Sequence, residues 1–354
     1  MRLWCAQVLG IARLELRKTL FSRRGLWVYL LAFGPAVLFV GRSIYAPREQ
    51  GRLEQVAAAR PISSETLSAI QVGLSRDEVV KKLGEPYQQW TGHHRSREEH
   101  VFCKYTDGKT DVTLIFSDGK LTQVFRNDLD TLPQNVQIFA TLFQSYTLRL
   151  AIFFGCVGIF INLFRGEMLD KSLHFYLLTP IRREVLLAGK YVAGLLATVV
   201  IFTTSTALQW TAMLWQFDRT IIATYLAGPG WGQFASYLGV TVLACVGYGS
   251  VFLAVGLLFR NPMIPATVVL LWEGVNPFLP AALKKISMIY YLQSLCPVVA
   301  TPDMDMPPML NLLISPTQPA TQATAITGIV LLTLLVLLVS ARLARKLEIN
   351  YSTD

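Results

Sequence analysis

Six long apolar runs constrain the fold of this chain more than any other feature of its sequence. A helix needs roughly 20 mostly apolar residues to cross a lipid bilayer. The runs are Leu26–Ile44, about Thr147–Phe164, Val185–Leu214, Phe234–Phe259, Met263–Pro280 and Thr324–Ala344. Of the 354 residues 53% are hydrophobic and only 16% are charged, which is more apolar than a soluble domain usually is. The sequence therefore predicts an α-helical polytopic membrane protein with six transmembrane helices.

These runs divide the chain into segments of different character. The first run follows a charged arm and has no small-residue cleavage site behind it, so we expect an anchor that stays rather than a signal peptide. The expected segments are an amphipathic interfacial helix at 1–24, the first span at 25–44, a soluble insert at 45–135, the second span at 145–164, a loop helix at 165–184, four further spans within 185–344 with an external loop at 281–323, and a tail at 345–354.

Charge placement predicts the orientation of the spans. If the N-terminus lies in the cytoplasm, the predicted cytoplasmic segments hold 15 Lys and Arg residues against 6 Asp and Glu residues, which accounts for the whole net charge of +9. Such a bias is the positive-inside rule. We therefore expect a bacterial cytoplasmic (inner) membrane protein with both termini cytoplasmic and 45–135 periplasmic. Its cations would face membrane lipids and not nucleic acid.

The insert has the composition of a small soluble domain. Ser63–Ile70 is expected to form one helix, and LSRDEVVKKLGEP a second, with Ser75 as N-cap and Glu78 three residues on. Alternating strands follow, and the pairs Asp107-Gly108 and Asp118-Gly119 are typical of hairpin turns. The sequence predicts an α+β unit with two helices and then three or four antiparallel strands.

The insert also resembles a known family. The stretch VGLSRDEVVKKLGEPYQQW, a strand with Tyr105 and then VTLIFSDGKL resemble the SmpA/OmlA (BamE-like) periplasmic domain over Ser63–Asn127. The matching positions are Gly73, Ser75, Val79, Leu83, Gly84, Pro86, Phe116 and Gly119. Most of these residues form turns or belong to the apolar core. The resemblance therefore implies a fold and not a chemical activity. The usual lipoprotein cysteine is absent, and the neighbouring spans would supply the anchor.

The segment Phe164–Gly194 separates the second and third spans. It mixes large apolar side chains with charges of both signs, which suits a short amphipathic helix that presents a surface to a partner protein. A bare loop needs no such face. Pro180 ends the turn, and three cations flank the start of the next span.

This segment carries a second resemblance. A glutamate at the end of span two, a short helix, LLTPIRREVLLAGKY and a long span are together similar to ABC-2 type transporter permeases. The basic arm, the six spans and the intramembrane pair Trp272-Glu273 also fit, whereas the large insert departs from the family pattern and leaves the substrate open. In that family the loop after span two couples to an ATP-binding subunit. The resemblance therefore implies coupling roles for Glu167, Asp170, Lys171, Leu173, His174, Phe175, Pro180, Arg182, Arg183 and Lys190.

The chain shows no energy source of its own. It has no G-x-x-x-x-G-K-[ST] loop, and Gly189-Lys190 is followed by Tyr191 within a predicted helix. We expect that the chain is not an enzyme and binds no cofactor itself, with ATP and Mg²⁺ held by a separate ATP-binding subunit. The family pattern also implies a second permease, in a homo- or heterodimer.

Glu273 and Arg149 are charged residues within predicted spans. Glu273 is the only acid placed well inside one, which is costly unless it is partnered. It could pair with a cation, bind part of a substrate or couple to a gate, with Trp272 beside it. It could also be hydrogen-bonded near the helix break that follows. Arg149 is expected at the outer end of span two, with its guanidinium reaching the headgroups.

Other chemistries find little support in the sequence. His93, His94, His100 and Cys103 match no standard metal-site spacing, so no metal site is predicted. A disulfide between Cys103 and Cys296 is left open. No nucleophile, base and orienting acid occur together, which argues against an intramembrane enzyme.

The leading hypothesis is the permease subunit of an ABC-2 type transporter, more an exporter than an importer. The alternative is a membrane-anchored scaffold for envelope assembly that acts through the BamE-like insert on a periplasmic or envelope protein. Dependence on an ATPase partner separates the two.

Overall fold

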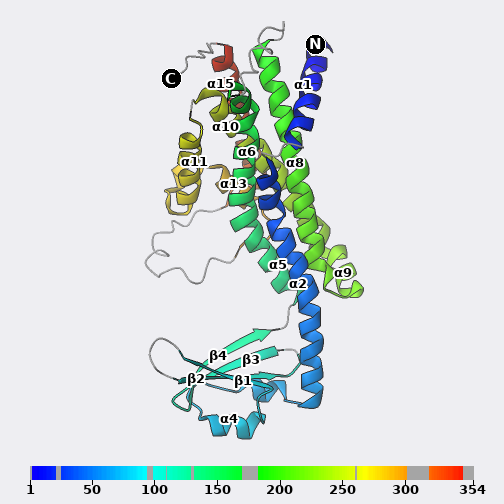
Figure 1. Cartoon of the computed structure of the whole chain (residues 1–354), viewed down its shortest axis with the longest axis vertical. Coiled ribbons are helices and arrows are strands. Elements are labelled where there is room, and N and C mark those ends of the chain that lie inside the picture. The colour runs from blue at the N-terminus through cyan, green and yellow to red at the C-terminus, as the bar shows by residue number, and fades with distance from the viewer. Residues whose placement is uncertain are drawn as a thin grey trace. The chain divides into compact units, whose positions relative to one another are not determined.

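The fold comes from a computed structural model, which describes residues 2–20, 25–93, 99–108, 110–128, 131–169, 182–259, 261–300 and 319–345. It contains two compact units. The larger unit is Met1–Phe39, Val136–Met213 and Asp218–Asp354, and the smaller is Val40–Asn135 with Leu214–Phe217. The larger unit is helical, and the sheet lies in the smaller (Figure 1).

Helices account for most of the chain. In chain order and outside the sheet domain they are α1 (Arg2–Leu20), α2 (Leu26–Ala59), α5 (Leu132–Leu142), the π-helix η2 (Phe143–Ala151), α6 (Ile152–Leu169), α8 (Arg183–Trp215), α9 (Arg219–Tyr225), η3 (Leu226–Gly230), α10 (Trp231–Leu258), α11 (Met263–Val275), η4 (Asn276–Phe278), α12 (Ala281–Lys284), α13 (Met288–Ser294) and α15 (Gln322–Arg345). Among the described residues, 5 helical runs are long and apolar enough to cross a membrane: Leu26–Ala59, Leu132–Phe164, Arg183–Trp215, Arg219–Leu258 and Gln322–Arg345.

The predicted span Met263–Pro280 is not confirmed as a full membrane helix. α11 has only 13 residues. At 1.5 Å per residue that is about 20 Å, short of the roughly 30 Å hydrocarbon core. Pro277 lies in the 3₁₀ turn η4 and lacks the amide that would continue the helix. The chain then proceeds through the short helices α12 and α13.

Two predicted boundaries differ in the structure. α2 continues to Ala59, so residues 45–59 extend the first helix instead of starting a separate fold; they are rich in strong helix formers. The second helical run begins at Leu132, before the predicted 145, because Phe139 and Phe143 extend its buried face. Arg149 therefore lies near the middle of the helical run Leu132–Leu169, and its place at the outer end of a membrane span stays a prediction.

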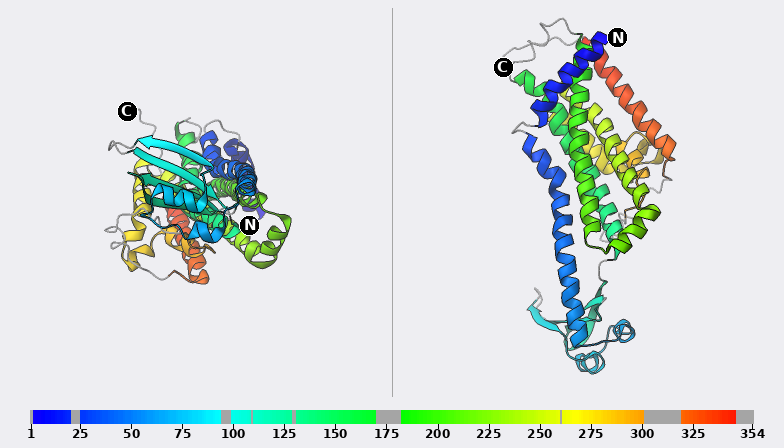
Figure 2. Two further views of the ribbon diagram at one scale, coloured as in Figure 1. Left: turned by 90° about the horizontal axis from the view of Figure 1, so that it is seen from below. Right: turned by 90° about the vertical axis from the view of Figure 1, so that its right-hand side faces the viewer.

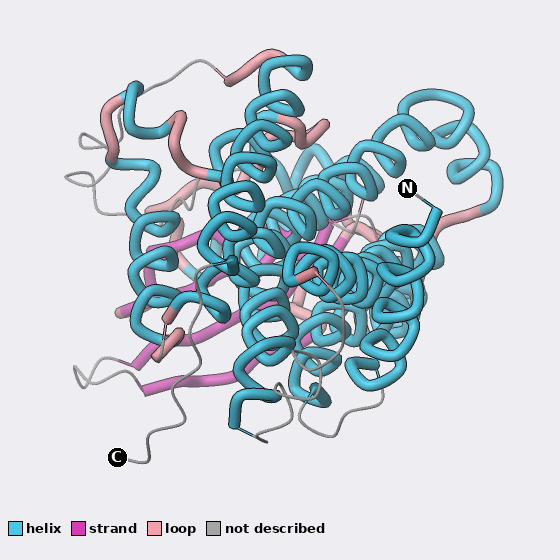
Figure 3. Tube along the Cα trace, turned by 90° about the horizontal axis from the view of Figure 1, so that it is seen from above, coloured by secondary structure: helices cyan, strands magenta, loops and turns pink. Residues whose placement is uncertain are grey.

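The larger unit is built around α10, which packs against α6 and α15 (Figure 2). Two glycines allow the close contact with α6. A Cβ on Gly249 would lie 2.5 Å from the ring of Phe160, and one on Gly256 would lie 2.9 Å from the backbone of Ile161. Figure 3, seen from above, shows helices that lie beside one another.

The smaller unit has the predicted order of elements. After α2 come α3 (Ser64–Ser68) and α4 (Arg76–Leu83), then β1 (Gln88–His93), β2 (Glu99–Thr106), β3 (Thr110–Ser117) and β4 (Lys120–Asp128). The strands pair antiparallel in the order β1-β2-β3-β4, so two helices followed by such a sheet are confirmed. Gly108 and Gly119 of the two Asp-Gly turns have φ of +85° and +76°, which glycine adopts without strain.

The sheet and the two small helices share one apolar core. Its buried residues are Leu67, Ile70, Val79, Leu83, Cys103, Tyr105, Val112, Leu114, Phe116 and Leu121. Cys103 is a free thiol in this core, and Cys296 of the larger unit is free as well. The structure therefore contains no disulfide between them, and the BamE-like identity of the unit stays a prediction.

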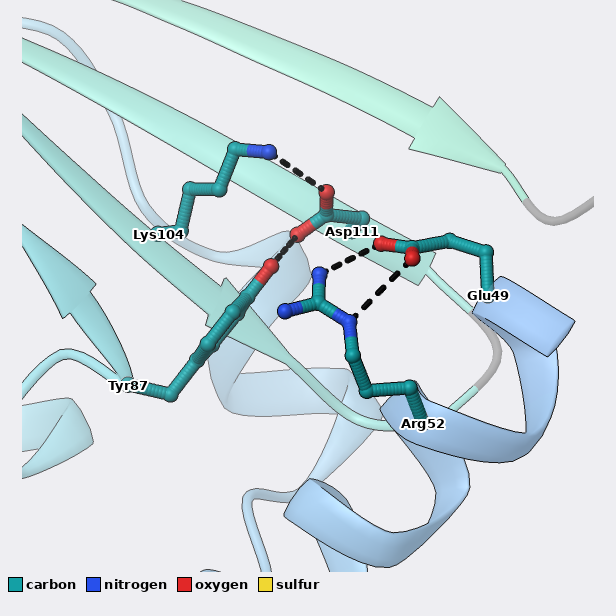
Figure 4. A network of polar contacts seen from close by, with 5 residues as sticks. All are labelled: Glu49, Arg52, Tyr87, Lys104 and Asp111. Atoms are coloured by element: carbon teal, nitrogen blue, oxygen red, sulfur yellow. Dashed lines mark hydrogen bonds and ion pairs between the residues drawn. The ribbon is translucent and has the colours of Figure 1, made fainter. Parts of the chain in front are cut away.

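A polar network fixes the last turns of α2 to the sheet within the smaller unit (Figure 4). The guanidinium of Arg52 donates to Glu49 at 2.5 Å and lies 5.9 Å from the ring centroid of Tyr87. Asp111 accepts a 2.7 Å hydrogen bond from the Tyr87 hydroxyl and pairs with Lys104 at 3.4 Å. Burial and the bond to Asp111 raise the pKa of Tyr87 above its usual value.

The capping box of α4 gives the first prediction. The Ser75 hydroxyl accepts from the amide of Glu78 at 3.3 Å, and the Glu78 carboxylate accepts from the amide of Ser75 at 3.0 Å. We expect Ser75→Ala to cost about 1 kcal/mol, because one amide of the first turn loses its acceptor. Hydrogen exchange in the full chain should become roughly fivefold faster across α4. Ser68→Ala removes a hydroxyl that donates to Glu65 within α3 and should leave α4 unchanged. Equal exchange across α4 in both variants would contradict the role of the cap.

Candidate functional site

Most of the predicted coupling segment lies outside the described residues. This holds for Asp170, Lys171, Leu173, His174, Phe175 and Pro180. Glu167 belongs to the last turn of α6, but its side chain is not described either. The helices that enter and leave the segment, α6 and α8, are among the described residues.

A buried ion pair joins three helices at this end of the larger unit. The ammonium of Lys190, in the second turn of α8, lies 3.1 Å from Oε1 of Glu15 in α1. It also donates to the carbonyl of Leu163 in α6 at 2.8 Å, and lies 5.3 Å from the ring centroid of Phe164. The two charged side chains are 0% and 3% exposed. Lys190 therefore points into the protein and does not present its charge at the surface.

The arm helix α1 is shaped for this contact. Its buried face consists of Ile11, Ala12 and Glu15, whereas Leu9 and Leu14 are exposed. A Cβ on Gly189 would lie 2.8 Å from Ile11, so the absence of a side chain there lets α1 approach α8. The helix predicted at 1–24 is thus packed against the protein along one face.

The start of α8 also holds the end of α15. Arg183 donates to the carbonyls of Ala344 and Arg345 at 3.3 and 3.2 Å, which would otherwise lack intrahelical partners. Arg345 in turn forms an ion pair with Glu184. The ends of α15 and α6 therefore meet the first turns of α8.

Arg182 is the predicted coupling cation that faces outward. It is exposed, and its guanidinium lies 4.8 Å from the ring centroid of Trp4 on α1. Trp4 is itself 49% exposed. Arg182 and the arm thus border one accessible surface next to the predicted coupling segment.

Glu273 is buried and serves as an acceptor for a neighbouring helix. Its carboxylate accepts hydrogen bonds from the Ser287 hydroxyl at 2.6 Å and from the amides of Met288 and Ile289 at 3.0 and 2.9 Å. These amides begin α13 and have no acceptor within that helix. The contacts favour the structural alternative for Glu273. Trp272 precedes it on α11 and is partly exposed.

Sequence reasoning missed Glu15. The one signal that could have found it is that Glu15 is the only acid among the first 48 residues. A single acid on a basic helix suggests a specific cation as partner, but the sequence does not say which. Within the described part of the chain, no group of three or more His, Cys, Asp and Glu side chains is placed to hold a metal ion.

Comparison with known proteins identifies a family. A family model described as ABC-2 family transporter protein matches residues 9–344, a range that includes Glu15, Lys190 and Glu273. No curated protein and no solved structure matches the chain.

The buried pair gives the second prediction. Lys190→Met should destabilise the protein by about 3–5 kcal/mol, because the Glu15 carboxylate would stay buried without its partner. Glu15→Met combined with Lys190→Met should recover most of that loss, since an apolar pair of similar volume needs no partner. Thermal melting in detergent measures both, with Lys285→Met, at an exposed lysine, as control. A double variant no more stable than Lys190→Met would contradict the assignment.

Proposed function

The chain belongs to the ABC-2 transporter family, so it is a multi-pass membrane permease subunit of an ABC transporter, and we propose that it is driven by a separate ATP-binding subunit that docks where α8 begins. This permease would form the translocation pathway. ATP and Mg²⁺ would be held by the partner, and a second permease, identical or not, would complete the pathway.

The buried Lys190–Glu15 pair carries this proposal. It lies at the base of the segment between α6 and α8 and joins both helices to the arm. Because the group is buried and charged, the three helices cannot separate there without exposing a charge to apolar surroundings. A push from a partner on residues 165–184 would therefore move α1, α6 and α8 together.

We infer that this end of the larger unit faces the cytoplasm. The end of α15 and the arm α1 both contact the first turns of α8, so the two termini lie on one side of the unit. An even number of passes follows, with α11 to α13 making the sixth in short pieces. The cations Arg182, Arg183 and Arg345 gather at this end, as the positive-inside rule requires of a cytoplasmic face.

The remaining parts follow from that orientation. The smaller unit would be periplasmic, where its BamE-like fold could contact a substrate or an envelope protein. Export is the direction that a periplasmic unit of this kind favours. The scaffold alternative keeps the same topology but needs no ATPase.

Copurification tests the proposal directly. The full chain in mild detergent should bring down an ATP-binding subunit, and Leu173→Asp with Phe175→Asp should abolish that, because both residues are predicted on the apolar face of the coupling helix. An envelope protein bound through residues 45–135, with no ATPase present, would replace the proposal by the scaffold reading.

Arg182 gives the third prediction. Arg182→Glu should lower substrate-stimulated ATPase activity of the assembled transporter at least several-fold, because it reverses an exposed charge at the docking surface. The melting temperature should stay close to that of the unmodified protein, since Arg182 is exposed. Arg219→Glu reverses another exposed arginine, in α9, and should leave the ATPase activity unchanged. Equal activity in the two variants would argue against docking at this surface.

A further inference from the structure

The second helical run contains a solitary cation. Arg149 is the only charged residue between Asp130 and Arg165, and Glu273 is the only one between Arg260 and Lys284. The fold brings the two into one neighbourhood, because η2, which carries Arg149, packs against α13, whose first amides Glu273 holds. Arg149, Glu273 and Tyr248 of α10 lie close enough for their charges to influence one another.

Arg149 and Glu273 do not satisfy each other. The carboxylate of Glu273 already accepts three hydrogen bonds from the start of α13. Nε of Arg149 is buried, and among the described residues it has no hydrogen-bond partner. The residue as a whole is only partly buried. Arg149 therefore has a hydrogen-bond donor without an acceptor, and the neighbouring carboxylate of Glu273 is already occupied by the start of α13.

Arg149 lies far along the second helical run from the end that binds Lys190. It lies 14 residues before Leu163, whose carbonyl binds Lys190, a separation of about 21 Å along the helix. It also lies within the nine-residue π-helical stretch η2. Headgroup contact through the tip of the guanidinium, which the sequence suggested, would still leave the buried Nε without an acceptor.

We propose that Arg149 binds the anionic head of an amphiphilic substrate, a phosphate or carboxylate on an apolar body, within the translocation pathway. The guanidinium presents a planar fork of donors that matches both groups, and its apolar surroundings strengthen the charge-assisted bonds. The nearby negative charge of Glu273 limits how tightly the anion is held, as a site that must release its ligand requires. The proposal rests on the proposed function, since it assigns a substrate class to that pathway.

Binding by the purified full chain tests this proposal. In dodecyl maltoside, the probes are dodecyl phosphate and dodecanoate, with dodecyltrimethylammonium as a cationic counterpart and inorganic phosphate to separate an amphiphile from a free anion. At least one anionic amphiphile should bind the unmodified protein, and Arg149→Gln should weaken it at least tenfold. Arg149→Lys should fall between them, because it keeps the charge and loses the fork. Arg219→Gln, at an exposed cation, should bind like the unmodified protein.

A variant of Glu273 should change the affinity for the anionic probe in the opposite direction. Glu273→Gln removes the neighbouring negative charge and should tighten the anion several-fold, whereas damage to the fold alone would weaken it. If Arg149→Gln does not fold, Arg149→Lys and Glu273→Gln carry the test. Unchanged affinity in Arg149→Gln, equal binding of the cationic probe, or inorganic phosphate bound as tightly as dodecyl phosphate would each overturn the proposal. The measurement needs no ATPase, so loss of the partner subunit would defeat the proposed function and leave this result standing.

Discussion

A charge enclosed by apolar helices is stable only when other groups take up its hydrogen bonds and its field, and the Lys190–Glu15 pair meets that requirement. The ammonium has a carboxylate at 3.1 Å and a backbone carbonyl at 2.8 Å, each from a different helix. Removing the arm would leave the ammonium of Lys190 without its carboxylate. The order of α1, α6 and α8 at this end of the larger unit depends on that pair, and so does the surface that Arg182 borders.

The features that local chemistry sets were predictable. Ser75 and Glu78 form the capping box that their spacing indicates, and the two Asp-Gly pairs make hairpin turns with glycines at positive φ. Each of these signals involves residues only a few positions apart. The stabilisation by the cap or turn is gained before any tertiary contact forms. The long apolar runs belong to the same class, because the cost of unpaired backbone groups in lipid leaves a helix as the only outcome.

The features that the sequence did not predict depend on distant or competing contacts. Glu15 and Lys190 are 175 residues apart, and no periodicity connects them. The run Met263–Pro280 is apolar enough for a span, but Pro277 and the capping of α13 by Glu273 break it into short helices. For α2 the error was the reverse: polar residues after Ile44 suggested a boundary, yet helix propensity and contacts with the sheet carry the helix to Ala59.

A comparison of Lys190 with Arg149, both in the larger unit, shows why the first is structural and the second is assigned to a ligand. Lys190 gives its donors to the protein, so the folded chain explains its presence completely. Arg149 leaves Nε without a partner in the described chain, which is a cost to the empty protein. An apolar side chain of similar length would occupy the same place in η2 without that cost. The stability of the chain alone therefore does not explain an arginine at this position, whereas an anion that enters, uses the free donors and leaves again does.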